Sequence, residues 1–286
     1  MSKNIFRKVT IIGVGLMGGS LGLALKKYEL AREIVGYSHR QASLMEALEM
    51  KAIDIAETDL GKAVRNADIV ILAAPVGAII KTLGNLSSTI RRHTIVTDLG
   101  STKIEIVDTA NKVLPDPRMF VGSHPLIGSE QKGVRFAKAE LFEKAICLMT
   151  PTEQTGQVAK EKVKLMWSKI GANVQIMSPV DHDRSLAYIS HLPHLIAFGL
   201  IETVPAQLLN NVPRSLLDIT RVASSPPQLW NDICLTNAKN LLKALDEFVK
   251  ILSTMRKNIV AQNQRDLTYQ FSKAKEKRDG IKIDNS

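Results

Sequence analysis

Short runs of β-branched and aliphatic residues alternate with helical patterns through residues 1–177. The early runs are almost continuously apolar, which is typical of strands in a parallel sheet covered by helices on both faces. Such alternation with short connections predicts a doubly wound α/β domain. Seven runs are predicted to be strands: Val9–Val14, Ile34–Tyr37, Ile69–Ala73, Thr94–Thr97, Met119–Val121, Ile146–Met149 and Val174–Met177.

The pattern changes after Ser178 and Pro179, where strand-like runs give way to helical spacing. From Leu241 to Ile259, apolar residues recur at intervals of four and three and form one stripe beside a charged face. Such a stripe is either core alone or also a subunit interface. We therefore predict an α/β domain over 1–177, an all-α domain over 178–272 and a disordered basic tail over 273–286.

Composition is that of an ordinary globular protein, since 45% of the 286 residues are hydrophobic and 23% are charged. The longest apolar run, residues 69–80, is short for a membrane span and is broken by Pro75. Cys147 and Cys234 have no partner spacing and predict neither a disulfide nor a metal site. No signal-peptide pattern precedes the first strand, so we expect a cytoplasmic protein without a membrane partner.

The formal net charge of +10 is compatible with nucleic acid, a membrane surface or an anionic small molecule as partner. Basic residues do not alternate with aromatic ones, and no nucleic-acid-binding motif is present. An anionic substrate and a phosphorylated cofactor explain the charge better, and we expect no nucleic-acid partner.

Three glycines follow the first predicted strand and open a predicted helix. Gly13 permits a tight turn, Gly15 lets a pyrophosphate approach the backbone, and Gly18 lets the helix pack on the strand. The phosphates would lie at a helix N-terminus, where N–H groups and the helix dipole favour anions. The pattern predicts a Rossmann-type dinucleotide site, which also includes Leu16, Met17 and Pro75.

The second predicted strand ends before Ser38, His39 and Arg40. Enzymes that use NAD usually carry an acidic residue here, which bonds the ribose hydroxyls and would repel a 2′-phosphate. A hydroxyl and a guanidinium can instead bind that phosphate. The segment therefore favours NADP over NAD.

Further polar segments stand at ends of predicted strands or on predicted helices. Ser101 and His124 follow strands, and ligands of open α/β sheets bind beyond such strand ends. Each has a simpler interpretation, because Ser101 can cap the next helix and His124 can stabilise a turn. The other segments lie in the predicted helical domain and contain His191, His194, Asp218, Arg221 and Trp230.

Taken in order, three of these segments resemble the prephenate and arogenate dehydrogenases of tyrosine biosynthesis. The segments are the turn His124-Pro125-x-x-Gly128, the segment from Ser190 to His194, and Thr220-Arg221. The resemblance runs from about Val9 to about Met255. It implies a dinucleotide-binding domain followed by a helical domain for substrate binding and dimerisation, and hence a homodimer.

The resemblance implies an oxidative decarboxylation in which a hydride leaves a cyclohexadienol ring for the nicotinamide and carbon dioxide departs. By similarity, His124 accepts the proton of the ring hydroxyl, and Ser101 orients that hydroxyl or His124 itself. Arg221 would clamp a substrate carboxylate, although it can also pair with Asp218 one turn earlier.

The same resemblance assigns the remaining candidates. His194 is expected to contact substrate, while His191 is either a second contact or a structural residue. Trp230 is either part of the core or near the site, where the resemblance also allows the neighbouring subunit to supply it. Glu130, Asp183 and Asp218 would form an ion-pair network that gates the site.

Several alternatives stay open at this point. Prephenate is favoured over arogenate because the positive charge of Lys132, beside the His124 turn, would repel the ammonium group of arogenate. A β-hydroxyacid dehydrogenase shares the glycine pattern, but it would need a lysine where this chain has His191 and His194. A catalytically silent NADP-sensing protein would not need His124 and Arg221.

Overall fold

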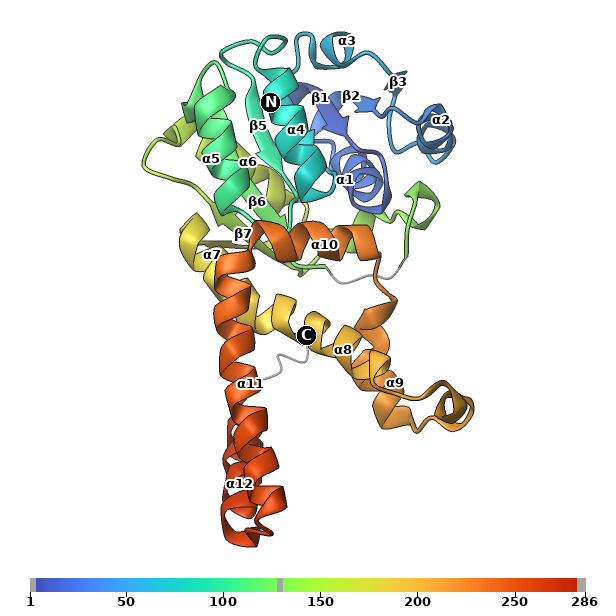
Figure 1. Ribbon diagram of the computed structural model, residues 1–286. Coiled ribbons are helices and arrows are strands. Elements are labelled where there is room, and N and C mark those ends of the chain that lie inside the picture. Colours follow the sequence, from blue (N-terminus) through green and yellow to red (C-terminus); the bar gives the residue numbers. More distant parts are fainter. Residues whose placement is uncertain (1–3, 128–130, 282–286) are drawn as a thin grey trace. The chain divides into compact units, whose positions relative to one another are not determined.

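The structure is a computed structural model that describes residues 4–127 and 131–281 (Figure 1). The chain forms two compact units, residues 1–238 and 239–286. Within the described residues, no helix is long and apolar enough to cross a membrane.

Eight strands form one sheet in the order β3-β2-β1-β4-β5-β6-β7-β8. All seven predicted strands are present, and the sequence reasoning missed only β3, a three-residue edge strand. The strands are β1 (Phe6–Ile12), β2 (Ala31–Tyr37), β3 (Ile55–Glu57), β4 (Ile69–Leu72), β5 (Ile95–Asp98), β6 (Phe120–Pro125), β7 (Ile146–Thr150) and β8 (Asn173–Ile176).

The sheet is parallel from β3 to β6, but β7 pairs antiparallel with β6. This pairing places Pro125 opposite Cys147 and His124 opposite Leu148. His124 therefore lies inside β6, whereas the sequence pattern predicted that it would follow the strand. The strand β8 pairs parallel with β7, so both run opposite to β1.

Helices cover both faces of the sheet, which confirms the doubly wound α/β prediction. Two apolar clusters lie on the two faces of the sheet. Adjacent residues of β1 point to opposite faces, so Ile11 packs into one cluster and Ile12 into the other. The first cluster includes residues of α1 (Leu16–Lys27), α2 (Gln41–Glu49) and α6 (Gln157–Lys169); the second includes residues of α3 (Leu60–Val64), α4 (Val76–Leu86) and α5 (Ile104–Val113).

The described residues after β8 are mainly helical, as predicted. A π-helical turn, Ala187–His191, joins the first two of these helices. The helices are α7 (Pro179–Leu186), α8 (Leu192–Glu202), α9 (Arg214–Thr220), α10 (Pro227–Thr236), α11 (Ala238–Val260) and α12 (Gln264–Asp279).

The second unit contains most of α11 and all of α12. The amide of Asn258 donates to Gln270 Oε1 at 3.3 Å and ties the two helices together. The predicted apolar stripe on α11 is partly buried and partly exposed. Leu241 is buried, whereas Leu252 and Ile259 are 46% and 62% exposed. Much of this apolar surface is therefore available for a partner.

The structure differs from the predicted disordered tail, because α12 continues through residues 273–279. The Asn263 side chain caps its N-terminus by accepting from the Asp266 amide, and Lys275 pairs with Asp279 one turn later. Lysine and glutamate also favour helices. These local interactions stabilise the helix although it contains few apolar residues, the feature on which the prediction of disorder was based.

Candidate active site

The turn between β1 and α1 has the geometry of a pyrophosphate site. Gly13 has a φ of +96°, and a Cβ there would lie 2.3 Å from the carbonyl oxygen of Ala73. A Cβ at Gly18 would lie 2.0 Å from the Gly13 oxygen, whereas the space around Gly15 is open to 4 Å. Helix α1 begins after Gly15 without a side-chain cap or an acidic residue in its first turn. Its N-terminal amides can thus receive a phosphate.

A cleft of about 330 Å³ lies against this turn. Leu16, Met17 and Pro75, which the sequence analysis assigned to the cofactor site, line it beside Gly15. Pro75 also precedes the first turn of α4. The cleft continues to Ser101 and His124, so a dinucleotide bound at α1 would have its reactive end near these two side chains.

Ser38, His39 and Arg40 follow β2, next to the end of β1. The amide of Gly13 donates to the carbonyl oxygen of Tyr37 at 2.9 Å, which fixes the two strand ends side by side. The Ser38 hydroxyl accepts from the Arg40 amide at 3.1 Å, and the Arg40 side chain is exposed. The segment does not line the 330 Å³ cleft itself.

A second cavity, of about 350 Å³, adjoins the cofactor cleft. Its walls come from β6, the π-helical turn, α8 and α10. Five residues line both spaces, namely Ser101, His124, Ile127, Pro226 and Leu229. The second cavity is therefore placed to hold a molecule in contact with the reactive end of a cofactor, with His124 between them.

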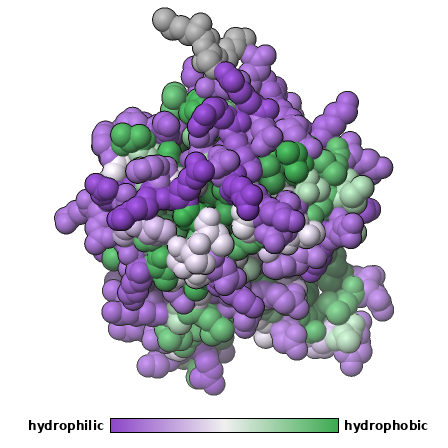
Figure 2. Space-filling view, turned by 90° about the horizontal axis from the view of Figure 1, so that it is seen from above, coloured by the Kyte–Doolittle hydropathy of each residue, from purple (hydrophilic) through white to green (hydrophobic). Residues whose placement is uncertain are grey.

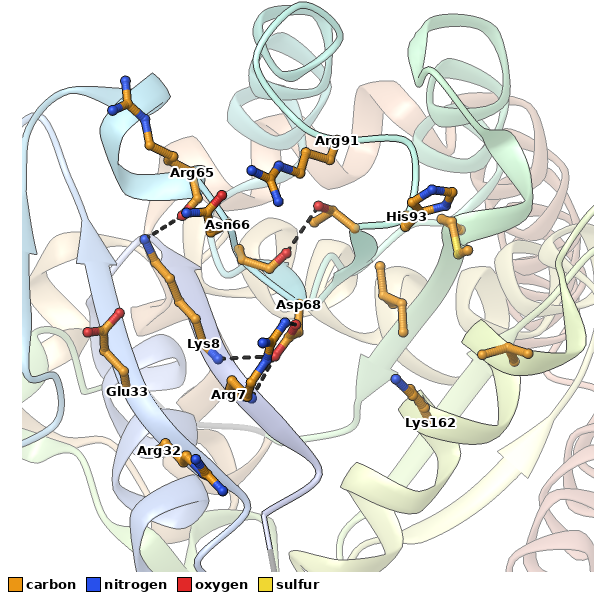
Figure 3. A pocket seen from close by; sticks show the side chains of 15 residues that line it. Arg7, Lys8, Arg32, Glu33, Arg65, Asn66, Asp68, Arg91, His93 and Lys162 are labelled. Atoms are coloured by element: carbon orange, nitrogen blue, oxygen red, sulfur yellow. Dashed lines mark hydrogen bonds and ion pairs between the residues drawn. The ribbon is translucent and has the colours of Figure 1, made fainter. Parts of the chain in front are cut away.

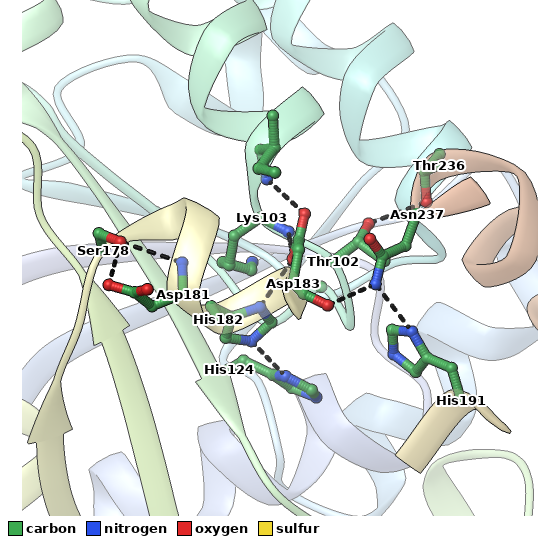
Figure 4. Close-up of polar contacts among 12 residues, drawn as sticks. Thr102, Lys103, His124, Ser178, Asp181, His182, Asp183, His191, Thr236 and Asn237 are labelled. Carbon is green, nitrogen blue, oxygen red and sulfur yellow. Dashed lines mark hydrogen bonds and ion pairs between the residues drawn. The ribbon is translucent and has the colours of Figure 1, made fainter. Parts of the chain in front are cut away.

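His124 is held by a chain of polar contacts (Figure 4). Its Nδ1 atom lies 2.9 Å from Nε2 of His182, and Nδ1 of His182 lies 2.8 Å from Oδ1 of Asp183. His182 and Asp183 are both fully buried on α7. Sequence reasoning missed His182, although its position next to a carboxylate was a usable signal.

This chain of contacts fixes the tautomers. The Asp183 carboxylate accepts the proton on Nδ1 of His182, so Nε2 of His182 is an acceptor. That acceptor takes the proton on Nδ1 of His124 and leaves a lone pair on Nε2 of His124. The network thus presents His124 to the site as a base.

The family resemblance implied that Asp183 takes part in an ion-pair network that gates the site; in the structure its carboxylate contacts His182 and two backbone amides. Its two carboxylate oxygens accept from the backbone amides of Lys103, at 2.7 Å, and Ile104, at 2.9 Å. These amides open α5, so Asp183 caps that helix from α7. Lys103, not Ser101, stands at the N-cap position of α5, so the structure does not support the simpler interpretation of Ser101.

A buried ion pair lies behind the site. The ammonium of Lys103 bonds Asp98 and donates to the carbonyl oxygen of Ser123 at 3.1 Å. Asp98 also accepts from the amides of Ser123 and Gly100. Both charged side chains have no exposed surface. The pair joins the ends of β5 and β6, next to His124 in the chain.

The surroundings favour neutral imidazoles. Burial lowers the pKa of His124 well below the ordinary 6.5, and the nearby His182, Lys103 and His191 lower it further. Burial also lowers the pKa of His182 to about 2 and that of His191 to about 4. His124 is thus unprotonated near neutral pH and able to accept a proton.

The helical wall of the second cavity contains His191, His194 and Trp230. The ring of His194 stacks on Trp230 with centroids 3.8 Å apart, and its Nδ1 donates to the carbonyl oxygen of Ser190 at 2.9 Å. His191 is buried and contacts Asn237 at 3.1 Å. Trp230 lines this pocket within its own chain.

Three candidates lie elsewhere. Asp218 is exposed and its Oδ2 is 3.9 Å from Nε of Arg214, so the structure gives no gating pair at this residue. Arg221 is exposed and lines neither cavity, although its charge contributes to lowering the pKa of His194. Glu130 lies outside the described residues.

Comparison with known proteins is consistent with this geometry. The prephenate dehydrogenase nucleotide-binding domain matches residues 21–176, and the prephenate dehydrogenase dimerization domain matches residues 178–273. Prephenate dehydrogenase of Bacillus subtilis is 35% identical over 282 residues, which span 96% of this chain and 76% of that protein.

Two solved structures resemble the chain along almost its whole length. Prephenate dehydrogenase from A. aeolicus, in complex with hydroxyphenyl propionate and NAD+, has a TM-score of 0.89 and 32% identity, covering 96% of this chain and 98% of that one. Arogenate dehydrogenase of Synechocystis has a TM-score of 0.80 and 28% identity, covering 95% and 99%.

Proposed function

The chain belongs to the prephenate dehydrogenase family, and on that basis we propose that it converts prephenate to 4-hydroxyphenylpyruvate with loss of carbon dioxide. The family makes the protein an oxidoreductase that uses a nicotinamide dinucleotide. The observation that carries the proposal is the position of His124, which lines both the cofactor cleft and the adjoining cavity.

The bound cofactor would accept the hydride from the ring carbon. His124 Nε2 takes the proton of the hydroxyl on that carbon, and this type of catalysis is typically worth ~10²–10⁴ in rate. The positive charge that develops on His124 is stabilised by its hydrogen bond to His182, which is itself hydrogen-bonded to the Asp183 carboxylate. Aromatisation of the ring drives the loss of carbon dioxide, so the protein mainly positions the substrate.

The cofactor fits the residues that are present. Gly15 leaves open space beside uncapped amides of α1, and Leu16, Met17 and Pro75 line the adjacent cleft. We propose NADP as the preferred form because Ser38, His39 and Arg40 offer hydrogen-bond donors and a positive charge to a 2′-phosphate. The carboxylate of Glu57, on the neighbouring strand β3, already accepts hydrogen bonds from the amides of Thr58 and Asp59.

The second cavity is assigned to the substrate. Ser101 and His194 line it from opposite elements, and His191 closes it from the π-helical turn. Arg221 is proposed to clamp a substrate carboxylate, supported by its electrostatic effect on His194. Lys132 lines the adjoining cofactor cleft and adds positive charge, which favours prephenate over arogenate with its ammonium group.

The proposed assembly is a homodimer formed through the helical domain. Residues 178–273 match a dimerization domain, and α11 exposes apolar side chains that a second copy would cover. The exposed apolar residues of α11 include Leu242, Val249, Ile251, Leu252, Ile259 and Val260.

A two-by-two comparison tests the proposal. Catalytic efficiency is measured with prephenate or arogenate as substrate and NADP+ or NAD+ as cofactor, by absorbance of the reduced nicotinamide. We expect the highest efficiency with prephenate and NADP+. Higher efficiency with arogenate would favour arogenate dehydrogenase, which yields tyrosine directly. Cofactor binding without turnover of either substrate would favour the silent sensor.

A further inference from the structure

A cavity of about 920 Å³ lies at the end of the sheet opposite the active site, where the parallel strands begin (Figure 3). Arg7 and Lys8 begin β1 there, and Thr94 and Ile95 begin β5. Because the glycine turn is at the other end of β1, no residue of this cavity belongs to the proposed cofactor site. Hydrophilic side chains cover most of the molecule seen from this end (Figure 2).

Positive charge dominates the cavity. Six lining residues carry a permanent positive charge, whereas two lining residues, Glu33 and Asp68, are carboxylates. Asp68 is already bound, because it accepts from the amides of Arg7 and Lys8 and pairs with the Arg7 guanidinium. The six cations are Arg7, Lys8, Arg32, Arg65, Arg91 and Lys162.

Local structural roles account for only part of this charge. The Lys8 ammonium donates to the carbonyl oxygen of Arg65 at 2.7 Å and so caps the end of α3. In contrast, Arg32 is on β2, Arg91 lies in the loop before β5 and Lys162 is on α6. The structure gives their side chains no hydrogen bond or ion pair within the described residues. Cations that converge on one cavity produce a positive potential that attracts an anion.

The fold adds a helix N-terminus to the cavity. Because β7 runs antiparallel to β6, its carboxyl end lies where the parallel strands begin. Helix α6 follows β7 and therefore starts at this end of the sheet, whereas α1 starts at the opposite end. Helix α6 has thirteen residues, no side-chain cap and no acidic residue in its first turn. Val158, in that first turn, lines the cavity together with Lys162 one turn later. Both the helix dipole and the side chains therefore favour an anion at this place.

We propose that this cavity binds a multiply charged phosphate compound of about nucleotide size. Guanidinium groups bind phosphate oxygens bidentately, and the cavity volume suits a small organic ligand. Ile95, Met119 and Val158 form an apolar side of the cavity, and His93 adds an aromatic ring. The phosphates bind the arginines and the N-terminus of α6, while an organic group lies against the apolar side.

Calorimetric titration of the full chain with inorganic tripolyphosphate and with ATP tests the proposal. The double variant Arg65→Gln/Arg91→Gln should bind both at least about tenfold more weakly, a loss of about 1.4 kcal/mol. Arg214→Gln, an exposed arginine outside the cavity, should leave binding unchanged. Arg40→Gln controls for binding at the proposed cofactor site. Tighter binding of ATP than of tripolyphosphate means that the apolar side is used, and equal binding means that the phosphates suffice; both support the site.

A second variant separates binding from folding. Val158→Asp places a carboxylate in the first turn of α6, where it should maintain or raise the melting temperature through the helix dipole. The same carboxylate should weaken phosphate binding. The proposal is overturned if neither compound binds at low salt, if Arg40→Gln alone abolishes binding, or if the cavity variants bind as tightly as the wild-type chain.

Discussion

The Nδ1 atom of His124 lies 2.9 Å from the Nε2 atom of His182, although 58 positions separate the two residues in the chain. The contact joins β6 to the first helix after the sheet. It orients the imidazole that faces both cavities and connects it to the buried Asp183. The catalytic proposal can therefore be tested one residue at a time along this network.

The first prediction concerns His124 itself. His124→Asn should lower kcat by ~10²–10⁴ and change KM little, because the amide keeps a polar contact but cannot accept the proton. His93→Asn, at the opposite end of the sheet, is the matched control and should leave both constants unchanged. In the wild-type enzyme, kcat/KM should fall with acid only below pH 6.5, because burial lowers the pKa of His124. An unchanged kcat in His124→Asn would remove this residue from the mechanism.

The second prediction tests the orienting role of His182. His182→Phe should lower kcat by about tenfold to a hundredfold, because the Nδ1–H group of His124 loses its acceptor. His182→Gln should recover part of that loss, since the Gln side-chain oxygen can accept the same proton. A residue with only a packing role would show the reverse order of activity. Steady-state kinetics of the two variants, with circular dichroism as a check on folding, decides between these outcomes.

The third prediction concerns the buried pair of Asp98 and Lys103. Lys103→Met leaves an unpaired buried carboxylate and should cost about 3–5 kcal/mol in free energy of unfolding. The double variant Asp98→Asn/Lys103→Met removes both charges and should recover most of that stability. Denaturant unfolding measures both. Equal destabilisation in the single and double variants would mean that the pair does not act as a unit.

The double variant also allows a kinetic test. Lys103 is one of the groups that lower the pKa of His124. Without this cation, the acid limb of kcat/KM should move to higher pH. A profile identical to that of the wild-type enzyme would show that Lys103 does not influence the protonation of His124.

The fourth prediction separates substrate binding from chemistry. Arg221→Gln should raise KM for prephenate by about tenfold or more, because a substrate carboxylate loses its guanidinium partner. The value of kcat should change little. Arg214→Gln, which removes the exposed pair with Asp218, is the control and should leave both constants unchanged. A fall in kcat with constant KM would exclude Arg221 as the carboxylate clamp.

The fifth prediction concerns cofactor choice. Arg40→Gln should lower the ratio of NADP+ to NAD+ efficiency by about tenfold, and Ser38→Asp should lower it further by repelling the 2′-phosphate. Arg135→Gln, an exposed arginine paired with Glu46, serves as the control. If the ratio is the same in all variants, the segment after β2 does not read the phosphate.

The sequence predicted the sheet well because its central strands are buried on both faces and are therefore almost wholly apolar. It missed β3, whose residues Ile55–Glu57 lie at the sheet edge and lack such a run. The glycine turn was predictable because its constraints are local: a positive φ at Gly13 and close packing at Gly18. Residues 273–279 were predicted to be disordered but are helical, because composition did not reveal the cap and the ion pair that support α12.

The polar network was harder to predict because its roles arise only from tertiary contacts. Asp183 was assigned to a gating ion pair, but it caps a helix whose first amides lie 80 positions earlier in the chain. His182 had no assigned role because its partner on β6 is equally remote in sequence. A resemblance to known enzymes identifies which residues matter, whereas burial and geometry determine what each one does.

The π-helical turn at Ala187–His191 has a consequence for how the substrate wall can change. A π turn contains about one residue more than an α turn, so deletion of one residue there would restore ordinary helical winding. The side chains of α8 would keep nearly the same orientation relative to α7, because a π turn accommodates its extra residue within a single turn. His194 would therefore still face Trp230, whereas the residues of the turn itself, which include Ile189, Ser190 and His191 in the pocket wall, would be repositioned. The segment can thus change one part of the pocket wall without turning the helix that follows.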